Sequence, residues 1–169
     1  MQPVNQFSLL GERRFLPFFL AQLSGAFNDN LFKNTLVLLI TYQAASYTTL
    51  DSGLLTNLAA GLFILPFVLF SAIAGQLADR YDKALLIRVI KFAEVLIMVL
   101  GGLGFATHSL TLLLGALFLM GVHSTFFGPV KYSILPRVLS DDELTGGNGL
   151  VESGTFAAIL AGTIASGLL

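Results

Sequence analysis

The chain has 169 residues, of which 55% are hydrophobic and only 11% are charged. Soluble domains carry roughly 25% charged residues, so this composition excludes a soluble enzyme and a disordered chain. A net charge of −1 leaves no basic face for nucleic acid, and the absence of cysteine excludes disulfides and thiolate metal sites. We therefore expect an all-α integral membrane protein that carries no cofactor.

Five apolar stretches predict five transmembrane helices. In chain order, these helices cover about residues 15–42, 54–78, 84–106, 109–130 and 148–169. At about 1.5 Å per residue, each stretch is long enough to cross a hydrocarbon core of about 30 Å. The first stretch contains charged residues in its middle and is too long for the apolar part of a signal peptide, so we expect it to remain in the mature chain.

The basic residues predict the orientation in the membrane. Lys and Arg occur before the first expected helix, around the second connection and in the fourth connection, whereas the first and third connections contain none. By the positive-inside rule, the N-terminal segment 1–14 is expected in the cytoplasm. The sequence ends within an apolar stretch, so we expect an N-terminal part of a longer protein, incomplete after the fifth helix.

Two charges lie near the middle of the first expected helix. Asp29 and Lys33 are four residues apart, and Gln22 and Ala26 extend the same face, with Asn30 on the neighbouring one. A charge at the bilayer centre costs at least about 2.5–3.5 kcal/mol, so this face must contact protein or water. Either an intrahelical ion pair that only joins helices, or a substrate or ion site at the midplane, would explain it.

Further charges occur in the third and fifth expected helices. Arg88, Lys91 and Glu94 are spaced three residues apart near the start of the third helix. Arg88 and Lys91 are long enough to reach the headgroups, whereas Glu94 lies deeper. In the fifth helix Glu152 is the acidic residue, and Lys131, directly after the fourth helix, is a cross-helix partner at similar depth. We therefore consider Arg88, Lys91, Glu94 and Glu152 as candidate charge partners.

Small residues recur every fourth position in the fifth expected helix. These are Gly154, Ala158, Gly162 and Ser166. Such a row allows two helix backbones to approach closely, and dispersion contacts then replace the hydrophobic drive that is absent in lipid. The pattern predicts that this helix packs in the interior of a bundle.

The connection between the second and third helices reads GQLADRYDK, residues 75–83. Its Gly75, Asp79 and Arg80 resemble the signature loop of the major facilitator superfamily. The match is partial, because Asp82 and Leu85 replace a glycine and a basic residue that are usual there. The resemblance implies a transporter in which Gly75, Asp79 and Arg80 take part in gating at the cytoplasmic face.

Three further segments are similar to the bacterial lysophospholipid transporter branch of that superfamily. They are AFNDNLFKN (26–34), FGPVKYSILP (127–136) and the stretch 146–169. The resemblance implies the first five of about twelve helices of a transporter that moves lysophospholipid across the bacterial inner membrane by alternating access. The opening sequence also resembles longer members fused to acyltransferase domains, so membrane lipid, the remaining helices and an acyltransferase are the expected partners.

The resemblance also implies a substrate site. Asp29 and Lys131 match motif positions of the branch, and Asn30 and Lys33 lie beside Asp29. A lysophosphatidylethanolamine offers an amine for Asp29 and a phosphate for Lys33 or Lys131. An apolar wall for the acyl chain is expected from six phenylalanines: Phe27, Phe32, Phe63, Phe67, Phe118 and Phe126.

Two alternatives stay open at this point. The chain could be a facilitator for another amphipathic or drug-like solute, or a membrane anchor for an acyltransferase that transports nothing. The sequence contains no nucleophile–base pair, no glycine-rich phosphate loop and no metal-ligand spacing, so we expect no enzymatic activity from this chain.

Overall fold

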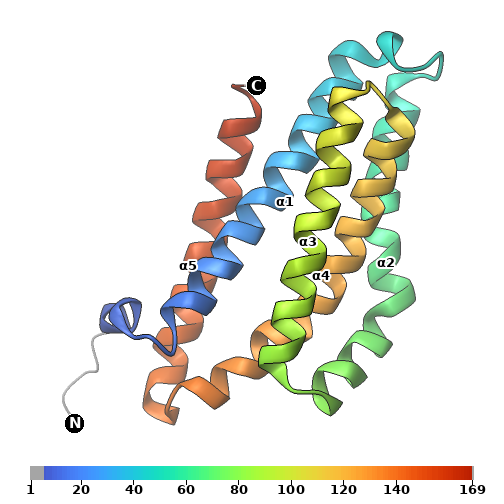
Figure 1. Ribbon diagram of the computed structural model, residues 1–169. Helices are drawn as coiled ribbons and strands as arrows, with labels where there is room; N and C mark the ends of the chain where they lie inside the picture. Colours follow the sequence, from blue (N-terminus) through green and yellow to red (C-terminus); the bar gives the residue numbers. More distant parts are fainter. Residues whose placement is uncertain (1–5, 169) are drawn as a thin grey trace.

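A computed structural model describes residues 6–168 of the chain, and residues 1–5 and 169 of the predicted N-terminal segment and fifth helix lie outside this range. Within the described residues the fold is all-α, as predicted. Five long helices alternate in direction (Figure 1). Their bounds are Leu16–Gln43 (α1), Ser52–Arg80 (α2), Lys83–Ala106 (α3), Leu110–Val138 (α4) and Asp141–Ser166 (α5), with short 3-10 helices Gln6–Gly11 (η1) and Ala44–Ser46 (η2).

Three of the described helices, α2, α4 and α5, are long and apolar enough to cross a membrane. α1 and α3 have comparable lengths of 28 and 24 residues. Together these lengths fit a bundle that spans a bilayer. The membrane spans predicted for α1 and α3 stay a prediction.

The ends of α4 and α5 differ from those predicted. α4 continues to Val138 rather than ending near residue 130, because Lys131 finds partners on α5 and does not interrupt the helix. α5 begins at Asp141 rather than at residue 148. A capping box starts it: the Ser140 hydroxyl accepts from the backbone of Glu143, and the Glu143 carboxylate accepts from the backbone N–H of Ser140 at 2.9 Å.

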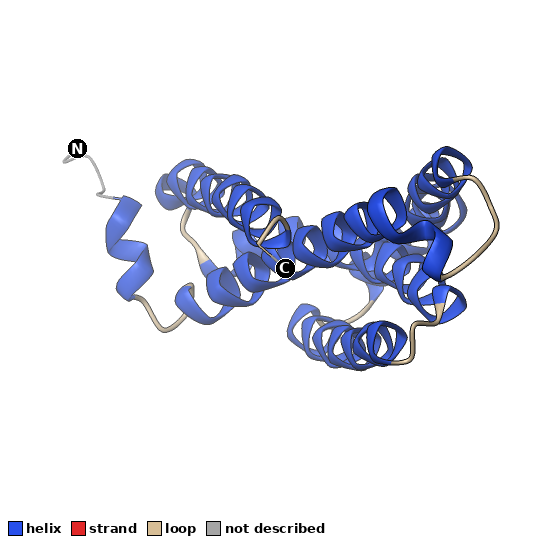
Figure 2. Cartoon of the chain, turned by 90° about the horizontal axis from the view of Figure 1, so that it is seen from above, coloured by secondary structure: helices blue, strands red, loops and turns tan. Residues whose placement is uncertain are grey.

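The helices form two groups. α1 packs mainly along α5, whereas α4 packs along both α2 and α3. Figure 2 shows the two groups side by side in an elongated arrangement, viewed along the helices. Contacts between α1 and the other group are sparse, so the space between the groups is where polar side chains gather.

Close approach within each group depends on glycines. A Cβ on Gly162 of α5 would lie 2.6 Å from the Phe27 carbonyl oxygen and 3.1 Å from the Leu31 nitrogen, both on the backbone of α1. In the other group, a Cβ on Gly121 of α4 would collide with the Phe63 carbonyl oxygen on α2. All four members of the small-residue row predicted in α5 are buried. The row therefore packs in the bundle interior.

An ion pair between Arg14 and Glu143 joins the segment before α1 to the start of α5. The Arg14 guanidinium donates to both carboxylate oxygens of Glu143, at 2.7 and 3.0 Å, and to the Val138 carbonyl at 2.9 Å. The Glu143 carboxylate raises the pKa of the Arg14 guanidinium above its usual range. The start of α1 is thereby joined to the α4–α5 connection, beneath an apolar cluster that includes Leu9 and Phe15.

Replacing Gly162 by leucine should separate α1 from α5. Backbone atoms of α1 cannot move aside as a flexible side chain can, so we expect a loss of about 1–3 kcal/mol in the free energy of unfolding. The measurement is the thermal midpoint of the purified protein in detergent. Ala161→Leu is the matched control, since Ala161 is exposed on the same helix, and equal midpoints for the two variants would contradict this packing.

Candidate functional site

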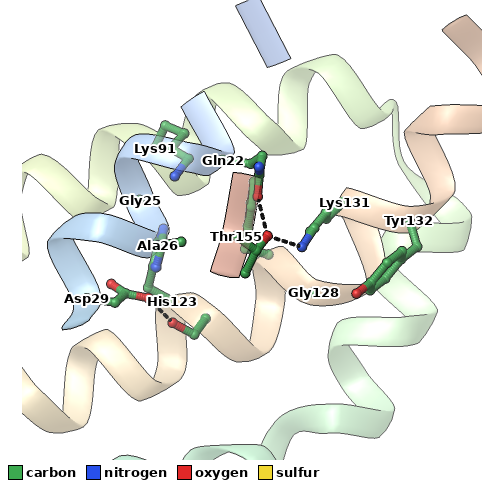
Figure 3. Close-up of a pocket in the computed structure, with 12 residues that line it drawn as sticks. Gln22, Gly25, Ala26, Asp29, Lys91, His123, Gly128, Lys131, Tyr132 and Thr155 are labelled. Carbon is green, nitrogen blue, oxygen red and sulfur yellow. Dashed lines mark hydrogen bonds between the residues drawn. The ribbon is translucent and has the colours of Figure 1, made fainter. Parts of the chain in front are cut away.

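A polar cavity of about 200 Å³ lies between the two helix groups (Figure 3). α1, α3, α4 and α5 all contribute to its wall. Its lining residues are Gln22, Gly25, Ala26, Asp29, Lys91, His123, Ser124, Phe127, Gly128, Lys131, Tyr132 and Thr155. The cavity therefore brings together side chains that are far apart in the sequence, among them two of the predicted substrate residues, Asp29 and Lys131.

Asp29 presents a partly unsatisfied carboxylate at this cavity. Its Oδ2 accepts a hydrogen bond of 2.9 Å from the Ser124 hydroxyl on α4. Its Oδ1 is buried and has no hydrogen-bond partner within the described residues. An unsatisfied carboxylate oxygen is costly in a low-dielectric interior, so this group is suited to accept a hydrogen bond from a ligand.

Glu94 of α3 joins a buried charged cluster. The Lys91 ammonium lies 2.7 Å from Glu94 Oε2, and His123 Nε2 of α4 lies 3.3 Å from the same oxygen. The His123 contact is close in distance but does not have hydrogen-bond geometry. Asn28 of α1 donates to Glu94 Oε1 at 3.5 Å. The cluster thus connects α1, α3 and α4 through a single carboxylate.

Close packing fixes the Lys91 side chain of this cluster. Its ammonium lies against Gly25 of α1, where a Cβ would collide with it, and 4.5 Å from the centroid of the Phe127 ring. The same ring stacks on His123 with an interplanar angle of 8°. Lys91 therefore contacts α1 and α4 from α3. Its pairing with Glu94 joins two of the residues that the sequence suggested as charge partners.

Lys131 forms a second network, between α4 and α5. Its ammonium donates to Glu152 and to Thr155, both at 3.1 Å, and Tyr132 donates to Glu152 at 3.0 Å. Thr155 in turn donates to Gln22 of α1 at 2.9 Å (Figure 3). The structure thus forms the Lys131–Glu152 pair that the sequence suggested and extends it to α1.

Lys33 faces a different space, which we call the lateral groove. This groove lies between α1, α2 and α4 and has a volume of about 360 Å³. Its lining residues are Lys33, Asn34, Leu36, Val37, Thr56, Ala59, Ala60, Phe63, Ile64 and Leu117. The Lys33 ammonium lies 5.1 Å from the centroid of the Phe63 ring, and no ion pair joins it to Asp29 within the described residues. Although the spacing allowed an Asp29–Lys33 pair, the two side chains turn to different helices.

Two of the remaining candidates lie away from both spaces. Asn30 donates to the Ala26 carbonyl at 2.8 Å and lies beside Gly162 of α5. Arg88 is exposed and forms no ion pair within residues 6–168. Neither side chain lines the polar cavity.

The six phenylalanines do not gather into one apolar wall. Phe63 lines the lateral groove, whereas Phe32 is buried against Phe105 and Phe126 packs on Phe70. Phe67 packs on Phe63 at a centroid distance of 5.9 Å, whereas Phe32 and Phe126 are used separately in helix packing and do not join them in one wall.

The comparisons with known proteins agree with this architecture. Residues 18–169 match the Major Facilitator Superfamily. The chain belongs to this superfamily. The fold is thus a part of the major facilitator fold, as the loop motif suggested, and no solved structure matches the chain.

Relatives in several bacteria are similar to this chain. The lysophospholipid transporter LplT of Pectobacterium carotovorum is 34% identical over 156 residues, which cover 89% of this chain and 34% of that protein. LplT of Cronobacter sakazakii is 30% identical over 163 residues, covering 95% of this chain and 37% of that protein. LplT of Serratia proteamaculans is 30% identical over 165 residues, covering 96% and 38%. The chain therefore spans about a third of the length of these relatives.

In the major facilitator loop motif, some residues stabilise the turn between α2 and α3, whereas others are exposed. Asp82 caps α3 by accepting from the Leu85 N–H at 2.9 Å, and the buried Lys83 ammonium donates to the Ala78 carbonyl at the end of α2. Asp79 and Arg80 are exposed and form no ion pair within residues 6–168, and a Cβ on Gly75 would meet open space. The capping residues hold the turn, which leaves the three motif residues accessible.

Sequence reasoning missed Ser124 and Thr155. Both are neutral, and hydroxyl residues are common in membrane helices, so neither position stands out without the neighbouring helices. The acidic residues and histidines of the described part of the chain form no group of three that could hold a metal. The candidate site is therefore a set of charges and hydroxyl groups suited to a polar organic ligand.

Replacing Glu94 by glutamine should destabilise the bundle. Removing one member of a buried ion pair leaves the other charge uncompensated, here Lys91, at a cost of about 3–5 kcal/mol. We expect a clear fall in membrane abundance and in the thermal midpoint of the purified protein. Arg88→Gln is the control on the same helix, and an equally small effect of both changes would show that the cluster does not hold α3 in place.

Proposed function

We propose that this chain is part of a transporter that moves lysophospholipid, of the lysophosphatidylethanolamine type, across the bacterial inner membrane by alternating access. The observation that carries the proposal is the polar cavity, with its unsatisfied Asp29 oxygen, in a chain similar to lysophospholipid transporters over most of its length. A zwitterionic headgroup needs groups of both signs within an apolar surrounding, and the cavity offers Asp29 and Lys131.

Within this proposal Asp29 binds the amine of the headgroup. An ammonium group that donates to Oδ1 would satisfy the oxygen that lacks a partner. Either Lys131 at the polar cavity or Lys33 in the lateral groove binds the phosphate as a point charge. Asn30 supports the headgroup site indirectly. Its side-chain amide donates to the Ala26 carbonyl, in the turn of α1 that carries Asp29.

The proposed gate is the loop between α2 and α3. Asp79 and Arg80 are exposed at the end of α2, next to this loop, and are available for contacts that form in one state of the transport cycle and break in another. Gly75 leaves open space one turn earlier, where another helix can approach closely.

The proposal includes the cellular setting. The N-terminal end of the bundle faces the cytoplasm, and the lysophospholipid is delivered to an acyltransferase, fused or separate, that restores the second acyl chain. This chain itself serves transport and supplies no catalytic residue.

Replacing Asp29 by asparagine should abolish most of the uptake. Losing a hydrogen bond to a charged group costs about 1.5–3 kcal/mol, so we expect a fall of about 10- to 100-fold in uptake of labelled lysophosphatidylethanolamine by spheroplasts. The protein is measured as its host produces it, at equal membrane abundance. Asp141→Asn, at an exposed site at the start of α5, is the matched control.

Each contrary result of this uptake experiment has a distinct meaning. If wild-type protein takes up no lysophospholipid, the substrate is wrong, and another amphipathic solute or an anchoring role has to be considered. If Asp29→Asn transports as fast as wild type, the charged face of α1 serves only packing.

The proposed orientation can be tested with single cysteines, since the chain contains none. Ser46→Cys, in the exposed η2 connection, should react in intact spheroplasts with a thiol reagent that does not cross membranes. Asp142→Cys, at the opposite end of the bundle, should react only after the membrane is opened. The reverse labelling pattern would place the N-terminus outside.

A further inference from the structure

The lateral groove differs from the polar cavity in its chemistry. Its wall is almost entirely apolar, with the buried residues Leu36, Ala59 and Leu117 at its base. Its volume of about 360 Å³ lies in the lower part of the range of small-molecule pockets, about 300–1,000 Å³. The small side chains of Ala59 and Ala60 on α2 leave room opposite α1. The groove is therefore a slot for a slender apolar group.

Lys33 is the one charged residue that lines this groove. Within residues 6–168 it has no ion pair and no hydrogen bond, and its contact is the Phe63 ring at 5.1 Å. A cation far from both ends of a membrane helix is unfavourable without a counter-charge, and an aromatic ring compensates it only in part. Lys33 is thus matched to an anion that comes from outside the described chain.

We propose that the lateral groove holds the single acyl chain of the lysophospholipid while Lys33 binds its phosphate. This inference rests on the proposed function and adds to it the residues that select a lipid with one chain. The charge at one end and the apolar slot beyond it correspond to the two parts of such a lipid. Diacyl lipids carry a second chain, for which this slot has no counterpart.

The groove also sets the direction of the chain. Lys33 and Phe63 lie near the middle of α1 and α2, whereas Val37 and Thr56 lie nearer the ends joined through η2. The acyl chain therefore extends from Lys33 toward the η2 end. With the N-terminus in the cytoplasm, the lipid lies with its phosphate on the cytoplasmic side of its chain, as in the inner leaflet. The groove then holds a lipid whose headgroup has already been inverted.

A photoreactive lysophosphatidylethanolamine, with a diazirine on the part of its acyl chain nearest the glycerol, tests this placement. The full protein, as its host produces it, is reconstituted in vesicles of diacyl phosphatidylethanolamine and phosphatidylglycerol, and labelled peptides are mapped by mass spectrometry. We expect labelling between Thr56 and Ala60, removed by excess unlabelled lysophosphatidylethanolamine. Lys33→Gln should lower the removable label at least about tenfold, whereas Lys33→Arg should keep most of it.

A second pair of variants tests the groove without changing a charged residue. Ala60→Trp places a large ring in the slot, whereas Leu69→Trp adds the same ring on an exposed part of α2 away from it. Only Ala60→Trp should reduce both the removable label and the uptake of lysophosphatidylethanolamine. Both variants are compared at equal membrane abundance.

Three results would overturn the inference. Equal labelling by a diacyl probe would show that the groove is ordinary lipid-facing surface. Removable label elsewhere, or crosslinks from Ala60→Cys to another segment of the same protein, would show a different occupant. Normal uptake in both Lys33→Gln and Ala60→Trp would reject the groove and the phosphate role of Lys33, but leave lysophospholipid transport through the polar cavity as proposed. If wild type shows removable label at the groove but no uptake, the proposed function fails while the lipid site stands.

Discussion

The structure depends on how it accommodates charged side chains in the interior of the helix bundle. A charge in hydrocarbon must face protein, water or a counter-charge, and each charged residue between the helix groups meets this demand differently. Glu94 lies close to Lys91 and His123, Lys131 is paired with Glu152, and Asp29 accepts from Ser124. These contacts reach from α1 to α3, α4 and α5, and they cross the region in which backbone packing between the two helix groups is sparse. The relative position of the groups therefore depends on these polar contacts together with the buried apolar cluster in which Phe32, Leu36 and Ile40 of α1 pack against α2, α3 and α4.

Within each group, the helices are held together by close contact between their backbones. Lipid is as apolar as the side chains, so helices gain little by burying apolar area and depend on close contact. Gly162 brings α5 against the backbone of α1, and Gly121 brings α4 against α2. Two closely packed helix groups thus provide an interior surface between them on which polar side chains from both groups meet.

The sequence was sufficient for features that depend on one helix at a time. The number of long helices and the burial of the small-residue row of α5 follow from spacing alone. Features that depend on neighbouring helices could not be predicted from the sequence. The direction of the Lys33 side chain is set by Phe63 of α2, and the direction of Asp29 by Ser124 of α4. The end of α4 was predicted too early. Lys131 indicates the end of a membrane helix as long as its partners on α5, Glu152 and Thr155, are not known.

The two lysines proposed for the phosphate differ in a way that bears on transport. Lys131 already has Glu152 and Thr155 as partners, whereas Lys33 has only an aromatic ring. A phosphate that reaches Lys131 must compete with Glu152, whose side chain is 41% exposed and can turn toward water. Binding there exchanges a contact between α4 and α5 for a contact with the substrate, so the substrate weakens one attachment between the two helix groups. A phosphate at Lys33 displaces no ion pair. Under the proposed function, phosphate binding at Lys131 would change a helix contact, whereas phosphate binding at Lys33 would leave the helix contacts as they are.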